Sequence, residues 1–76
     1  MTVQDSILEI LNSNINTSFT TNEITNLIIE NNIYDFSKAK YPERVVGSQL
    51  SKMLNKNLYS LQVNKENRPY LYFLQK

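Results

Sequence analysis

The first hydrophobic stripe of the chain has the spacing of one face of a helix. It comprises five aliphatic side chains at helical intervals: Val3, Ile7, Leu8, Leu11 and Ile15. This pattern predicts an amphipathic helix over about residues 3–14. Thr2 can cap this helix, and Asp5 places a favourable negative charge in its first turn.

A second helix is predicted over about residues 21–31, after a short extended segment around Phe19. Thr20 and Glu23 have the capping-box spacing S/T-x-x-E directly before an apolar run. The side chains expected to face the core are Ile24, Leu27 and Ile28. Ile29 lies off this stripe.

The third predicted helix begins at a proline and has two chemically different sides. Residues 33–41 form a connection with apolar anchors, and Pro42 suits a first helical position because that N–H would be unpaired anyway. The helix is predicted over about residues 42–56. Its core side carries Val46, Leu50, Met53, Leu54 and Asn57. Its opposite side carries Arg44, Ser48, Ser51, Lys52 and Asn55, with Gln49 on the flank.

The end of the chain is rich in residues that favour β-strands. Two such segments lie at about residues 58–63 and 70–74, and a polar turn separates them. The aromatic side chains of the second segment fit the core of a hairpin, with a base-stacking platform as the alternative: Tyr70, Tyr72 and Phe73.

This order of elements predicts a single α+β domain over residues 1–76, a winged helix-turn-helix. In this fold, a three-helix bundle is combined with a short first strand and a C-terminal β-hairpin wing. A chain of 76 residues is shorter than the usual domain of ~100–200 residues, so we expect one small domain with a thin margin of stability.

The composition excludes several kinds of catalytic and metal chemistry. The chain has no cysteine and no histidine, which rules out disulfides, thiol redox chemistry, Cys/His zinc sites and a Ser-His-Asp triad. Its single glycine, Gly47, lies within a predicted helix, so the sequence has no glycine-rich phosphate loop. Asp5 and Glu9 share a helix face, as is typical of a solvated surface. We therefore expect no enzymatic activity, no metal and no cofactor.

Nothing in the hydrophobic pattern suggests a membrane protein. No apolar run approaches the length that a membrane span needs, and the first residues show neither a basic start nor an apolar signal core. We expect a cytoplasmic protein, or one inside a host cell if the source is viral. The abundance of asparagine fits a low-GC microbial or viral genome.

Charge is divided unequally between the two halves of the chain. Residues 1–36 carry five acidic side chains and no basic one, whereas residues 37–76 carry all eight basic side chains and two acidic ones. Such asymmetry indicates a polyanionic partner for the basic half. A recognition helix also needs short polar or basic side chains opposite its apolar face, so that it can approach the major groove. We therefore expect double-stranded DNA as the partner.

The candidate DNA contacts lie on the third helix, in the connection before it and in the wing. On the helix they are Arg44, Ser48, Gln49, Ser51, Lys52 and Asn55. The expected phosphate contacts, which position the protein without reading sequence, are Lys38, Lys40, Lys65 and Arg68. Gly47 weakens the helix by about 1 kcal/mol relative to alanine. Close helix packing or close approach of DNA would explain that cost.

Several positions of the third helix and the hairpin match a known pattern. They are Pro42-Glu43, Val46, Ser48-Gln49-Leu50 and Phe73-Leu74. Over about residues 19–74 the chain resembles the HARE-type helix-turn-helix, a winged-helix family found in restriction endonucleases, chromatin proteins and the delta subunit of bacterial RNA polymerase. Tyr41 stands where that family has a capping threonine, and Asn67-Arg68-Pro69 replaces its wing glycine. The resemblance implies a winged helix that binds or senses DNA, although some members act through protein contacts.

The sequence therefore predicts a small transcriptional or mobile-element regulator that binds duplex DNA. A monomer of this size binds weakly, so a homodimer or a larger protein complex is a plausible assembly. One alternative is a winged helix that binds other proteins through its acidic half or its aromatic hairpin. Another is the DNA-targeting module of a larger nuclease.

Overall fold

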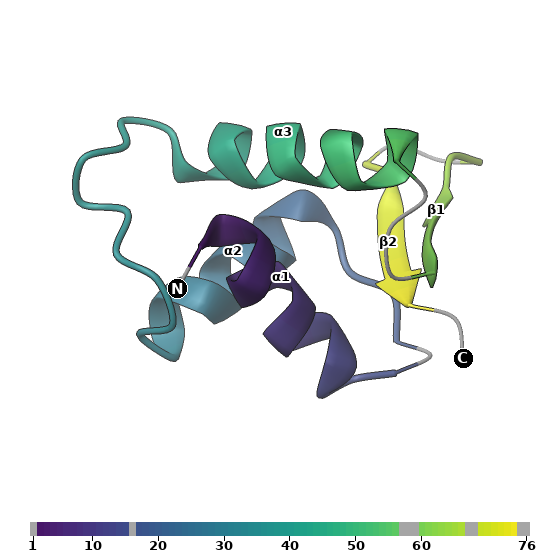
Figure 1. Ribbon diagram of the computed structural model, residues 1–76, viewed down its shortest axis with the longest axis horizontal. Helices are drawn as coiled ribbons and strands as arrows, with labels where there is room; N and C mark the ends of the chain where they lie inside the picture. The colour runs from purple at the N-terminus through teal and green to yellow at the C-terminus, as the bar shows by residue number, and fades with distance from the viewer. Residues whose placement is uncertain (1, 16, 57–59, 67–68, 75–76) are drawn as a thin grey trace.

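A computed structural model of the chain describes residues 2–15, 17–56, 60–66 and 69–74. Over these residues the chain forms three α-helices followed by a two-stranded antiparallel sheet (Figure 1). The elements are α1 (Val3–Asn12), α2 (Thr21–Glu30), α3 (Pro42–Asn55), β1 (Leu61–Asn64) and β2 (Leu71–Leu74). The predicted α+β class and the predicted order of these elements are confirmed.

Local capping chemistry determines where α1 and α2 begin. The Thr2 hydroxyl accepts a hydrogen bond from the backbone N–H of Asp5 at 3.1 Å, and the Asp5 carboxylate accepts one from the N–H of Thr2 at 3.3 Å. Thr20 and Glu23 form the same reciprocal pair at the start of α2, at 3.1 and 2.9 Å. Each pair satisfies backbone N–H groups that the helix itself leaves unpaired. Both predicted helix starts are confirmed.

The helix ends depend on asparagine side chains and backbone geometry. α1 ends at Asn12, earlier than predicted, and the Asn14 amide Nδ2 donates to the Ile10 carbonyl at 2.8 Å. After α2, Asn32 has a left-handed φ of 52°. The N–H groups of Ile33 and Asn32 donate to the Ile28 and Ile29 carbonyls, both at 3.1 Å. This pair of bonds is the Schellman motif, which favours glycine or asparagine at its left-handed position.

All three helices contribute side chains to one hydrophobic core. The fully buried ones are Ile7, Leu11, Ile24, Ile28, Val46, Leu50 and Met53. The hairpin and the connection before α3 complete this core with Leu61, Tyr72, Leu74 and Phe36. The predicted inner face of α3 is therefore confirmed for Val46, Leu50 and Met53, with Leu54 half-buried. Asn57 lies outside the described residues.

The hairpin is held to the helical part by a backbone bridge. β1 pairs with β2 so that Leu61 lies opposite Leu74. Phe19 and Tyr72 exchange two backbone hydrogen bonds, at 2.9 and 2.7 Å, so the predicted strand around Phe19 is a one-residue bridge. Among the described residues β1 begins at Leu61, and Ser60 directly before it has a left-handed φ of 59°. Residues 58–59 lie outside the described residues.

The arrangement of the helices leaves one side of α3 open. In Figure 1, α3 runs along one side of the molecule, with α1 and α2 packed beneath it. The hairpin lies at the C-terminal end of α3 and the 33–41 connection at its N-terminal end. The molecule measures 31 × 23 × 21 Å. Among the residues that the structure describes, no helix is long and apolar enough to cross a membrane.

Candidate nucleic-acid interface

The outer face of α3 presents basic and short polar side chains to solvent. The exposed side chains on this face are Arg44, Ser48, Ser51, Lys52 and Asn55. The same helix buries Val46, Leu50 and Met53 completely on its other face. This division follows from the 3.6-residue period of the helix. The structure therefore brings these predicted contacts together on one exposed surface.

An aromatic ring joins two of the predicted basic contacts at the start of α3. The Tyr41 ring is 46% exposed. The Arg44 guanidinium carbon Cζ lies 4.8 Å from its centroid, and the Lys40 Nζ lies 5.6 Å from it. Both distances are within the range of cation–π attraction. We call Lys40, Tyr41 and Arg44 the Tyr41 cluster.

Sequence patterns alone predicted Lys40 and Arg44 as DNA contacts but gave Tyr41 no such role. Tyr41 is the N-cap of α3, but its side chain forms no capping hydrogen bond. The spacing of Tyr41 and Arg44 is a usable signal, because residues three positions apart at a helix start share a face. Val45, which is 37% exposed, is a second surface residue of this turn that the predicted contacts omitted.

Glu43 lies away from the exposed basic face. It lines a shallow depression against α2 together with Asn22, Thr25 and Asn26. Arg44 is exposed, whereas Glu43 is half-buried. The one carboxylate of α3 therefore sits on the flank that packs towards α2, so it does not neutralise the outer face.

Gln49 is a predicted DNA contact whose side chain is hydrogen-bonded within the protein. Its amide Nε2 donates to the Gln4 side-chain oxygen at 3.1 Å, which joins α3 to α1. The Gln49 side chain is half-buried. A contact from Gln49 to DNA would therefore have to compete with this interhelical hydrogen bond.

The remaining predicted phosphate contacts flank α3. Lys38 and Lys40 are exposed in the connection before the helix. Lys65 is exposed just after β1, with its Nζ 5.9 Å from the Tyr70 ring centroid. Arg68 lies outside the described residues. Positive charge is thus placed at both ends of α3, because the connection and the hairpin lie at opposite ends of this helix (Figure 1).

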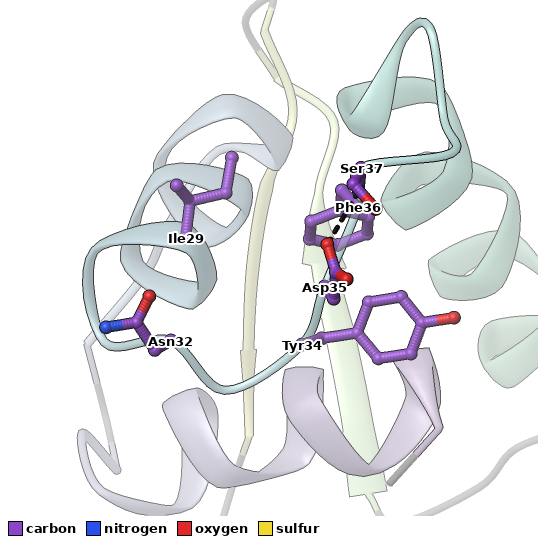
Figure 2. Close-up of a pocket in the computed structure, with 6 residues that line it drawn as sticks. All are labelled: Ile29, Asn32, Tyr34, Asp35, Phe36 and Ser37. Carbon is purple, nitrogen blue, oxygen red and sulfur yellow. Dashed lines mark hydrogen bonds between the residues drawn. The ribbon is translucent and has the colours of Figure 1, made fainter.

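A separate open groove lies beside the C-terminal end of α2. Ile29 and Asn32 lie on one side of it, and Asp35, Phe36 and Ser37 of the connection lie on the other (Figure 2). Its remaining lining residue, Tyr34, pairs with Phe36 at a centroid distance of 4.9 Å. The exposed side chain of Ile29 makes this groove partly apolar.

Two carboxylates of the first half are engaged in helix caps. Asp5 and Glu23 are each engaged in a capping box. Within the described parts of the chain, no group of acidic side chains is arranged to hold a metal ion. Comparisons of the chain with protein-family models, with curated proteins and with solved structures give no match.

Proposed function

We propose that this chain is a winged-helix domain that binds double-stranded DNA. The observation that carries the proposal is that α3 has a buried apolar face and an exposed basic face. Basic and short polar side chains occupy its open face, whereas the acidic side chains Asp5, Glu9, Glu23 and Glu30 are exposed on α1 and α2. A polyanion would be attracted to the first surface and repelled by the second.

In the proposed complex, α3 enters the major groove and the hairpin turn approaches the backbone. Ser48 and Ser51 are short enough to allow close approach, while Lys52 and Asn55 can reach phosphates and base edges. Lys65 would contact a phosphate from the hairpin. The order of elements and the HARE-type resemblance support this reading. The same surface would serve a small transcriptional or mobile-element regulator or the targeting module of a larger nuclease.

Titration of the protein into a fluorescent mixed-sequence duplex tests the proposal. Fluorescence anisotropy at about 50 and 200 mM salt should show micromolar binding that weakens steeply with salt. Three to six phosphate contacts, at about 0.9 per contact, give a log–log slope of about −3 to −5. Absence of binding at the lower salt concentration would refute the proposal.

A charge-matched pair of variants locates the interface. Arg44→Ala combined with Lys52→Ala should weaken binding at least about tenfold, which is about 1.4 kcal/mol. Both side chains are exposed, so the variant should remain folded and lose at most the about 0.5–1 kcal/mol of an exposed cation–π contact. Thr17→Glu combined with Ser18→Glu changes the net charge by the same amount in the exposed α1–α2 loop and should have a much smaller effect. Equal weakening by both pairs would mean that net charge alone, and not α3, governs binding.

Protein binding through the acidic half or the aromatic hairpin is the competing function. Tyr72 is buried, and Tyr70 and Phe73 are half-buried, so the aromatic hairpin does not form a fully exposed patch. The groove beside Ile29 is the better surface for a protein partner (Figure 2). This alternative gains support only if the duplex titration fails.

A further inference from the structure

The exposed arginine at the start of α3 does not extend freely into solvent. Its Cζ lies 4.8 Å from the Tyr41 ring centroid. An unrestrained arginine must lose side-chain freedom before it can bind, and stacking on an aromatic face removes part of that freedom beforehand. The Tyr41 ring therefore limits the orientations that the Arg44 guanidinium can take.

The backbone keeps this ring and this guanidinium together. Tyr41 precedes Pro42, and a residue before proline is held out of the helical region, as its φ of −129° and ψ of 83° show. Its carbonyl accepts a hydrogen bond from the Arg44 backbone N–H at 3.0 Å. Both residues of the pair are thus tied to the same first turn of α3.

We infer that Tyr41 is a positioning residue that orients Arg44 to contact a guanine in the major groove, an inference that rests on the proposed DNA binding. A guanidinium held over a ring at this distance can turn a flat face to the ring and keep its N–H edge available. A phosphate accepts that edge over a broad range of directions, whereas the N7 and O6 atoms of guanine require a fixed plane for two parallel bonds. Pre-orientation therefore favours base contact over phosphate contact.

The position of the pair and the charges around it agree with this assignment. Recognition helices usually meet base edges near their N-terminus, where Tyr41 and Arg44 lie. Glu43, the nearest carboxylate along the chain, lines the depression against α2 and leaves the Arg44 donors unopposed. Lys40, whose Nζ is 5.6 Å from the same ring, supplies a point charge suited to the adjacent phosphate.

The geometry of the pair can be tested without DNA. In the wild-type protein, ring currents should shift the NMR signals of the Arg44 side-chain methylene protons upfield. Tyr41→Phe keeps the ring and should keep the shift, whereas Tyr41→Leu should abolish it. Because Tyr41 is 46% exposed, both variants should remain folded by circular dichroism. Unshifted signals in the wild type would overturn the inference.

The DNA test uses a preferred duplex selected from a random library with the full chain. Replacing one guanine of that duplex at a time with 7-deazaguanine removes only the N7 acceptor. At one position this should weaken binding of the wild type and of Tyr41→Phe about five- to tenfold. Arg44→Ala and Tyr41→Leu should lose this sensitivity, while Tyr41→Leu keeps the wild-type salt slope because no phosphate contact is removed.

The outcomes separate the inference from the proposed function. If the wild type binds duplex DNA but Tyr41→Leu still discriminates against 7-deazaguanine, only the positioning role is overturned. An Arg44→Ala variant with a salt slope reduced by about one contact would instead place Arg44 on a phosphate, again overturning the inference alone. If the wild type binds no duplex at low salt, the proposed function and the inference fail together.

Discussion

Replacing Gly47 with alanine should stabilise the protein, even though this glycine lies in the middle of α3. Glycine in a helix interior is about 0.8–1.0 kcal/mol less favourable than alanine. The substitution to alanine is unfavourable only where the added methyl group would collide with a neighbouring atom. At Gly47, the nearest atom outside the local helix backbone and the adjacent residues is the Thr21 Cγ2, at 3.6 Å from the added Cβ, which is an ordinary contact. We therefore expect a gain of about 1 kcal/mol.

Urea denaturation followed by circular dichroism measures this gain directly. The midpoint should rise with an unchanged slope, and the melting temperature should rise by about 4–8 °C for a domain of this size. Ser51→Ala, on the exposed face of the same helix, is the control and should gain only about 0.5 kcal/mol from propensity. A Gly47→Ala protein that is less stable than the wild type would refute the reasoning.

The same variant addresses why the glycine is present. The added methyl group would face Thr21 on α2, not the open face of α3. We therefore expect Gly47→Ala to bind DNA as tightly as the wild type. Weaker binding by this stabilised protein would show that DNA approaches the backbone at Gly47. Unchanged binding together with the expected gain in stability would show that neither DNA approach nor the packing between α2 and α3 requires a glycine at this position.

Two further substitutions test other surface features. Val45 is 37% exposed next to Arg44 and suits contact with a thymine methyl group. Replacing the thymines of the preferred duplex with uracil removes these methyl groups. In an anisotropy titration, this replacement should weaken binding of the wild type but not of Val45→Ala. Ser60 has a φ of 59°, where glycine is relieved of the Cβ strain. In urea denaturation, the free energy of unfolding of Ser60→Gly should rise by about 0.5–1 kcal/mol. The control Gln62→Gly, in β1, should be less stable than the wild type. A less stable Ser60→Gly protein would contradict the argument.

The starts of the helices were predictable because their causes are local. Each threonine cap acts on a backbone group three residues away, and Pro42 fixes its own φ, so Val3, Thr21 and Pro42 could be identified from short patterns. The end of α1 at Asn12 was less predictable. Serine has no preference for the left-handed conformation that Ser60 adopts, so nothing in the sequence marks it.

The candidate site was predictable as a surface but not as a set of contacts. Periodicity alone places Arg44, Ser48 and Lys52 opposite the buried face of α3. The hydrogen bond between Gln49 and Gln4 depends on how α1 packs against α3, across 45 positions of sequence. The spacing of Tyr41 and Arg44 places them on one face, but the contact between guanidinium and ring depends on side-chain torsions that the spacing does not specify. The helical period determines which side chains share a face of α3, whereas tertiary packing determines which side chains contact each other.

The size of the molecule bears on how it could achieve specificity. One small DNA-binding module buries about 600–1,000 Å² of protein surface, roughly a tenth to a fifth of the 5223 Å² that this chain exposes. Such an interface holds few base contacts, so a single copy would discriminate weakly between sites. Half-sites one helical turn apart have centres about 34–36 Å from each other, and the longest dimension of this chain is 31 Å. Two copies could therefore occupy successive turns on one face of the duplex and lie close together, which would allow a homodimer to combine two weak interfaces without a linker.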